Sequence, residues 1–120
     1  MSKSLDRKCS VLYADDEASL REQFLMFVED TRWVPTVVRD GAEALNSFTA
    51  GSFDVVLTDF NMPRMNGGRL AAAVKTLDAR QPVIILTGSP ILEGEMAAAN
   101  LVLAKPISRD ALLTALNSFV

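Results

Sequence analysis

The hydrophobic residues of this chain fall into short continuous runs separated by longer stretches with helical spacing. The continuous runs cover residues 9–14, 33–38, 53–58, 82–86 and 101–104. Runs of this length without alternating polar residues are typical of parallel strands that are buried on both faces. Pro35 weakens the second run and favours an edge position, because proline cannot donate a hydrogen bond to a central ladder. The pattern therefore predicts five parallel strands, with the second at an edge.

Amphipathic helices are predicted between these strands. After the first strand, apolar residues recur with the spacing of one helix face, at Leu20, Phe24, Phe27 and Val28. Later helices have candidate N-caps, whose side chains accept hydrogen bonds from the first helical turn, at Asp40, Asn66 and Ser108. The segment 90–99 is the weakest, because Pro90 and Gly94 leave room for only a short helix.

This alternation predicts an α/β fold in a single domain. Five strands and about five helices, the fourth of them short, form a doubly wound parallel sheet with helices on both faces and right-handed crossovers. A length of 120 residues suits one domain. We expect its core to span about residues 8–120, with residues 1–7 as a short N-terminal extension.

The composition excludes several classes of function. There is no histidine, which rules out catalytic triads and the usual zinc sites, and the chain itself cannot carry a phosphohistidine. A net charge of −3 with scattered basic residues argues against a nucleic-acid surface. The longest apolar run, residues 83–86, is far too short to span a membrane, and no secretory signal is visible. We therefore expect a cytoplasmic protein that contacts neither nucleic acid nor membrane.

Polar and charged residues follow the strands at the ends where ligands bind in parallel sheets. Asp15 and Asp16 follow the first strand, Asp59 the third, Thr87 the fourth and Lys105 the fifth. Three carboxylates packed together repel one another unless a cation neutralises them or their pKa values rise. Mg²⁺ prefers oxygen ligands and suits such a cluster, while Lys105 and Thr87 add a positive charge and a hydroxyl donor. Together these groups are the parts needed to hold a phosphoryl group on a carboxylate.

Each of these residues also has an ordinary structural interpretation. Taken alone, Asp15 and Asp16 suggest an N-cap, Asp59 suggests a turn, and a lysine before proline is usually solvated. Their occurrence together, each at a predicted strand end, favours a shared site over these separate interpretations.

Four segments of the chain resemble the signature segments of one known family. They are YADDE (13–17), VVLTDFNMPRMNG (55–67), ILTG (85–88) and LAKPI (103–107). In this combination they are similar to the response-regulator receiver domains of two-component signalling, in particular to chemotaxis-type single-domain receivers. The resemblance implies a flavodoxin-like sheet with the strand order 2-1-3-4-5.

The resemblance also implies a role for each candidate residue. Asp59 is the expected phosphoacceptor, Thr87 is expected to hydrogen-bond the phosphoryl group, and Lys105 is expected to pair with it. The implied Mg²⁺ ligands are Asp15, Asp16, Asp59 and the backbone carbonyl of Asn61. The peptide bond before Pro106 is expected to be cis.

The implied partners are a sensor histidine kinase or a phosphotransfer protein, together with a downstream protein target. The receiver itself is expected to be a monomer or a weak dimer. It is not expected to be an enzyme beyond its own phosphoryl transfer and autodephosphorylation.

Two features depart from the family pattern. Val102 stands where receivers usually carry tyrosine or phenylalanine, and the span from Thr87 to Lys105 is shorter than usual. A receiver-like binding module that works without phosphorylation therefore stays open as an alternative. An aspartate-dependent phosphatase is a third hypothesis, although that class typically carries a second aspartate where this chain has Asn61.

Overall fold

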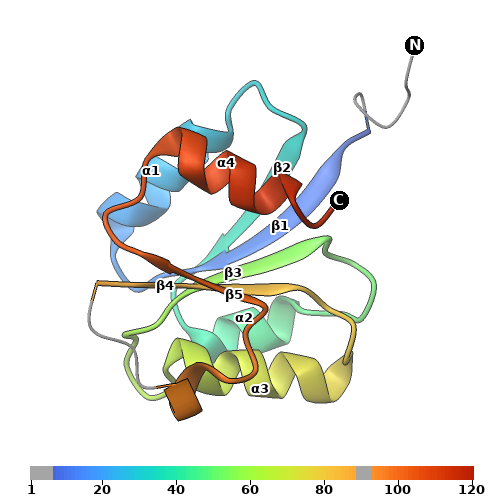
Figure 1. Cartoon of the computed structure of the whole chain (residues 1–120), viewed down its shortest axis with the longest axis vertical. Coiled ribbons are helices and arrows are strands. Elements are labelled where there is room, and N and C mark those ends of the chain that lie inside the picture. Colours follow the sequence, from blue (N-terminus) through green and yellow to red (C-terminus); the bar gives the residue numbers. More distant parts are fainter. Residues whose placement is uncertain (1–6, 89–92) are drawn as a thin grey trace.

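A five-stranded parallel sheet forms the centre of the computed structural model, which describes residues 7–88 and 93–120 (Figure 1). The strand order is β2-β1-β3-β4-β5, as predicted, and it places the proline-containing strand at one edge. The strands are β1 (Cys9–Ala14), β2 (Trp33–Val38), β3 (Val55–Asp59), β4 (Val83–Thr87) and β5 (Leu101–Ala104).

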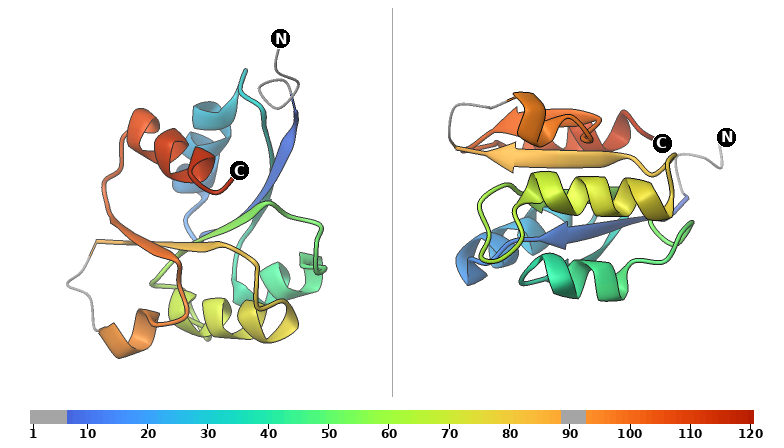
Figure 2. Two further views of the ribbon diagram at one scale, coloured as in Figure 1. Left: turned by 45° about the vertical axis from the view of Figure 1, so that its right-hand side comes forward. Right: turned by 90° about the horizontal axis from the view of Figure 1, so that it is seen from below.

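Helices cover both faces of this sheet. They are α1 (Ala18–Val28), α2 (Gly41–Ser47), α3 (Gly67–Leu77) and α4 (Arg109–Asn117), and one 3-10 turn, η2 (Glu93–Met96), precedes β5. The left view of Figure 2 shows α1 and α4 together on one side of the sheet, with α2 and α3 on the other. The three-layer arrangement predicted from the sequence is confirmed.

Side chains of the central strands alternate between two hydrophobic clusters. In β1, Val11 and Tyr13 belong to the cluster under α1 and α4, whereas Leu12 and Ala14 belong to the cluster under α2 and α3. All four are buried, and β3 and β4 are buried along their whole length. Burial on both faces explains why these strands lack polar alternation in the sequence.

The predicted N-caps of three helices are present. The side chain of Asp40 accepts a hydrogen bond from the N–H of Glu43, at the start of α2. Asn66 and Ser108 cap α3 and α4 in the same way, each accepting from the backbone N–H three residues later. These bonds satisfy amide groups that a helix leaves without an internal partner in its first turn.

The prediction of about five helices needs a correction at the fourth. The described residues contain four α-helices, and between β4 and β5 they contain only the 3-10 turn η2. Pro90, on which the prediction partly rested, lies outside the described residues. This turn lies against the start of α3, where a side chain at Gly68 would put its Cβ 1.8 Å from the carbonyl oxygen of Glu95.

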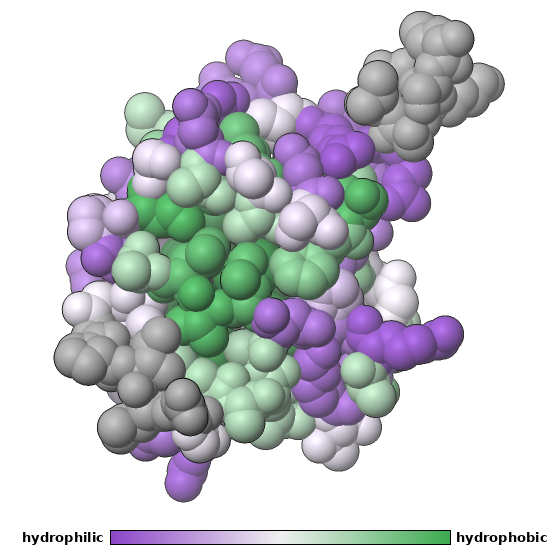
Figure 3. All heavy atoms as spheres, in the orientation of Figure 1, coloured by the Kyte–Doolittle hydropathy of each residue, from purple (hydrophilic) through white to green (hydrophobic). Residues whose placement is uncertain are grey.

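The strand β5 forms the second edge of the sheet and is only half buried. Val102 packs against the cluster under α2 and α3, together with Ala98 and Ala99 from the loop that follows η2. Apolar side chains gather on the side of the molecule that carries β5 and α4 (Figure 3). None of the helices in the described ranges has the length and apolar character needed to cross a lipid bilayer.

Candidate functional site

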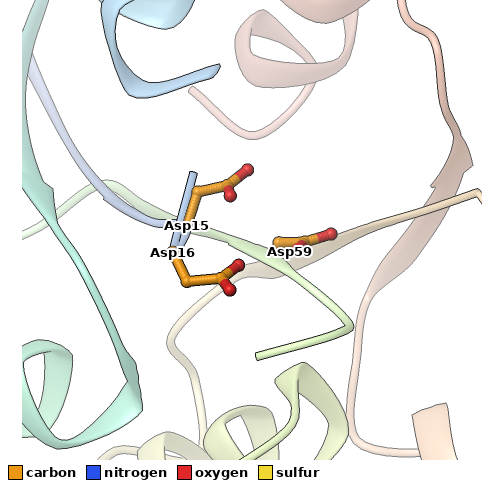
Figure 4. A group of neighbouring side chains, drawn as sticks. All are labelled: Asp15, Asp16 and Asp59. Atoms are coloured by element: carbon orange, nitrogen blue, oxygen red, sulfur yellow. The ribbon is translucent and has the colours of Figure 1, made fainter. Parts of the chain in front are cut away.

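Three carboxylates meet at the carboxyl end of the sheet. Asp15 and Asp16 directly follow β1, and Asp59 is the last residue of β3. The two strands are neighbours in the sheet, with Ala14 opposite Thr58, so the register brings the next residues of both strands side by side. One oxygen from each carboxylate lies within 4.8 Å of the other two, and all three side chains project to the same side (Figure 4).

Burial differs among the three acidic side chains. Asp15 is 0% exposed and Asp59 4% exposed, whereas Asp16 lies open to solvent. Buried carboxylates are rarely tolerated unless hydrogen bonds or a cation compensate for the loss of water.

Lys105 supplies the positive charge at this cluster. Its ammonium Nζ lies 2.8 Å from Oδ1 of Asp59 and 3.6 Å from Oδ2 of Asp15. The strands position it, because Thr87 of β4 pairs with Ala104 of β5 and the N–H of Lys105 donates to the carbonyl of Thr87. The peptide bond between Lys105 and Pro106 is cis, as the resemblance implied.

Burial, hydrogen bonding and the nearby charges together leave the pKa values of both Asp59 and Lys105 raised. Burial raises the pKa of Asp59; the hydrogen bond and charge of Lys105 oppose this rise, and the charges of Asp15 and Asp16 add to it. Burial lowers the pKa of Lys105, but the hydrogen bond to Asp59 and the nearby carboxylate charges outweigh it and leave that pKa raised. One ammonium does not balance three carboxylates, so the cluster favours an additional cation.

Asp15 is held more firmly than the sequence indicated. The hydroxyl of Tyr13 donates to its Oδ2 at 2.5 Å, and the backbone N–H of Glu17 donates to its Oδ1 at 3.0 Å. The guanidinium of Arg21 donates to the backbone carbonyl of Asp15. Sequence reasoning did not assign Tyr13 to the site, although a tyrosine two residues before an aspartate on one strand places both side chains on the same face.

The capping interpretation of the two aspartates is wrong. The N-cap of α1 is Glu17, and no side chain makes a capping hydrogen bond there. Nor is Lys105 simply solvated, since its side chain is 21% exposed and is hydrogen-bonded to Asp59. The structure therefore favours one shared cluster over separate structural roles for the aspartates and the lysine.

The remaining predicted residues lie around this cluster. Thr87 ends β4 and is 2% exposed, one position beyond the residue that pairs with Asp59. Asn61 follows Asp59 by two residues in the loop before α3, and its side chain is exposed. That loop is closed by Gly67, whose N–H donates to the carbonyl of Phe60 and whose position leaves no room for a Cβ, which would lie 2.5 Å from the carbonyl oxygen of Asp59.

The donor set fits a hard divalent cation. Mg²⁺ takes oxygen ligands and retains several waters, and here one oxygen from each of three carboxylates converges at a rim that is open on the side of Asp16. The described residues provide no histidine or thiolate at this edge that would favour zinc.

Comparison with known proteins decides the family. The sequence profile of the response regulator receiver domain matches residues 11–117, nearly the whole chain. This chain belongs to the response regulator receiver domain family. Receiver domains of two-component systems are signalling modules, generally non-enzymatic, that interact with histidine kinases or phosphotransfer proteins.

Similar receivers occur within larger proteins and as solved domains. The chain is 35% identical over 77 residues to the sensor histidine kinase RcsC of Salmonella typhi, a match that covers 61% of this chain and 8% of RcsC. A response regulator receiver domain protein from Clostridium thermocellum superposes with a TM-score of 0.85 at 28% identity and covers 92% of each chain.

A third likeness concerns the fold alone. The receiver domain of the sensor histidine kinase PA1611 from Pseudomonas aeruginosa has a TM-score of 0.84 at 24% identity, over 93% of this chain and 97% of that one. That structure has a magnesium ion coordinated in its active site cleft.

Proposed function

We propose that this receiver accepts a phosphoryl group on Asp59 from a sensor histidine kinase or a phosphotransfer protein, with Mg²⁺ as the cofactor. The observation that carries this proposal is the position of Asp59 at the centre of the site. Its carboxylate is hydrogen-bonded to Lys105 on one oxygen and lies beside Asp15 and Asp16. The phosphorylated domain then signals through protein contacts to a downstream target.

The chemistry assigns different tasks to the two oxygens of Asp59. Oδ1 is held by the ammonium of Lys105, which leaves Oδ2 to attack the phosphorus atom of the donor. A bond forms between Oδ2 and phosphorus while the phosphorus–nitrogen bond of the donor phosphohistidine breaks, and the imidazole leaves with the electron pair. Lys105 remains beside the aspartyl phosphate and stabilises its added negative charge.

Asp15, Asp16, Asp59 and the backbone carbonyl of Asn61 would hold the metal. A bound magnesium ion supplies charge neutralisation for the carboxylates and for the incoming phosphoryl oxygens. The hydroxyl of Thr87, at the end of the adjacent strand, is assigned to hydrogen-bond one phosphoryl oxygen.

A receiver-like module that binds partners without phosphorylation is the second candidate. The observation in its favour is at the output side, where Val102 replaces the usual aromatic residue and only a 3-10 turn stands between β4 and β5 in the described residues. The intact cluster at Asp59 favours the phosphorylated receiver.

Incubation with acetyl phosphate and Mg²⁺ separates these functions. A stable mass adduct on the intact protein supports the phosphorylated receiver. Absence of an adduct with a correctly folded protein supports the binding module, and repeated turnover of an external phosphate ester would indicate a phosphatase. The cytoplasmic location, the monomeric or weakly dimeric state and the single domain over residues 1–120 are further parts of this proposal.

A further inference from the structure

We propose that Tyr13 is a positioning residue for the magnesium site, acting through Asp15. This inference rests on the proposed function, because it concerns the same acidic cluster. The juxtaposition that carries it is the hydrogen bond from the hydroxyl of Tyr13 to Oδ2 of Asp15, between two side chains that are 3% and 0% exposed.

The bond is of the strong type. A hydroxyl that donates to an ionised carboxylate forms a charge-assisted hydrogen bond, which is stronger than one between neutral groups. Both groups lie in the protein interior, away from water. In that environment such bonds are strengthened, and an unpaired carboxylate oxygen is costly. The hydroxyl of Tyr13 therefore has a strong influence on the orientation of Asp15.

The other contacts of Asp15 complete a fixed arrangement. The N–H of Glu17 holds Oδ1, and the ammonium of Lys105 lies 3.6 Å from Oδ2. The hydroxyl of Tyr13 and the N–H of Glu17 thus each donate to a different oxygen of the Asp15 carboxylate. Groups that hydrogen-bond a ligand carboxylate in this way orient it toward the metal.

The ring of Tyr13 is buried in the hydrophobic cluster under α1 and α4. It packs against Phe24 of α1 with ring centroids 4.5 Å apart, while it also lines a cavity of about 310 Å³ that Lys105 borders as well. The core holds the ring, and the hydrogen bond to Asp15 fixes the hydroxyl at the acidic cluster. Tyr13 and Asp15 consequently hold each other in place.

Removal of the hydroxyl leaves Oδ2 of Asp15 without its strongest donor while keeping the ring. We expect Tyr13→Phe to weaken Mg²⁺ binding by about tenfold, at the low end of the range seen when groups behind a metal ligand are removed. In an Asp15→Asn background the same change is expected to have no further effect, because Tyr13 acts on the metal only through Asp15.

The test is titration of the whole chain with MgCl2 in a calorimeter, for the wild type, Tyr13→Phe, Asp15→Asn and the double variant. The matched control is Phe24→Leu, which disturbs the packing of the ring but leaves the hydroxyl; its thermal stability is expected to fall while its Mg²⁺ affinity stays that of the wild type.

Wild-type Mg²⁺ affinity in Tyr13→Phe would overturn the assignment. A loss of Mg²⁺ affinity in Phe24→Leu equal to that in Tyr13→Phe would also overturn it, because it would indicate that Tyr13 has a merely structural role. An additive loss in the double variant would likewise exclude action through Asp15. If the wild type itself binds no Mg²⁺, the proposed metal site is wrong, and this inference is wrong with it. If the wild type binds Mg²⁺ and Tyr13→Phe binds it equally well, only this inference is overturned.

Discussion

The ammonium of Lys105 lies 2.8 Å from Oδ1 of Asp59, although 46 positions separate the two residues in the chain. The parallel sheet makes this contact, because β3, β4 and β5 are adjacent and end at the same edge. The pair identifies Asp59 as the carboxylate at the centre of the cluster. It also identifies Lys105 as the positive charge available to a phosphoryl group attached to Asp59.

Replacement of Lys105 by methionine is expected to destabilise the metal-free protein. The variant keeps the apolar stem but leaves the buried carboxylate of Asp59 without its ammonium, which costs about 1–3 kcal/mol of unfolding free energy. Urea unfolding in EDTA at neutral pH measures the loss, and added Mg²⁺ should recover part of it. The exposed Lys8 provides the matched control, since Lys8→Met should change stability little. Equal stability of Lys105→Met and wild type would show that the pair does not compensate the cluster.

Magnesium is expected to stabilise the folded chain through the carboxylate cluster. A free concentration about ten times the Kd should add about 1.4 kcal/mol to the unfolding free energy, because the metal binds the folded state. Asp16→Ala removes one of the three oxygens and should remove most of this gain in a thermal melt. Glu22→Ala, which deletes an exposed carboxylate on α1, should retain it. A full magnesium response in Asp16→Ala would exclude Asp16 from the ligand set.

The metal-free stability of the wild type is expected to depend on the ionisation of Asp59. Burial raises the pKa of this carboxyl, so the folded state binds its proton more tightly than the unfolded chain does. Stability is therefore lost as pH rises from the ordinary carboxyl value of about 3.9 through the raised pKa. Asp59→Asn, which can still accept from Lys105, should be more stable than wild type at neutral pH in EDTA, with an advantage that vanishes under acidic conditions. Lower stability of Asp59→Asn at neutral pH would contradict this account.

The close approach at Gly68 predicts an unusual effect of an alanine in a helix. Alanine favours helices over glycine by about 1 kcal/mol, yet at this position the added Cβ would lie 1.8 Å from the carbonyl oxygen of Glu95. Gly68→Ala should therefore lower the melting temperature and increase hydrogen exchange over residues 94–99. Gly94→Ala is the control, because nothing lies within 4 Å of its added Cβ. Equal tolerance of the two substitutions would show that η2 is not seated on α3.

The five strands and the acidic cluster could be predicted because their signals are local, whereas the strand order was implied by the resemblance to receiver domains. Continuous apolar runs identify strands buried on both faces, and the residue that ends each run lies at a known edge of the sheet. Asp59 and Lys105 were predictable on this basis alone, and the N-caps Asp40, Asn66 and Ser108 follow from residue type.

The features that sequence reasoning missed depend on contacts between distant segments or on side-chain orientation. The hydrogen bond of Tyr13 to Asp15 depends on where the phenol hydroxyl of Tyr13 lies, which the residue types alone do not show. The turn at η2 depends on how closely Gly68 lets the backbone of Glu95 approach α3. Glu17 takes the N-cap position of α1 while the carboxylate of Asp15 is engaged by Tyr13 and Lys105.

The central claim, that Asp59 is the phosphoacceptor, is tested most directly by locating the modified residue. Treatment with acetyl phosphate and Mg²⁺, followed by borohydride, converts an aspartyl phosphate to homoserine, which peptide mass spectrometry assigns to a position. We predict homoserine at position 59 in the wild type and none in Asp59→Asn. Homoserine at Asp15 or Asp16, or an adduct that persists in Asp59→Asn, would contradict the account.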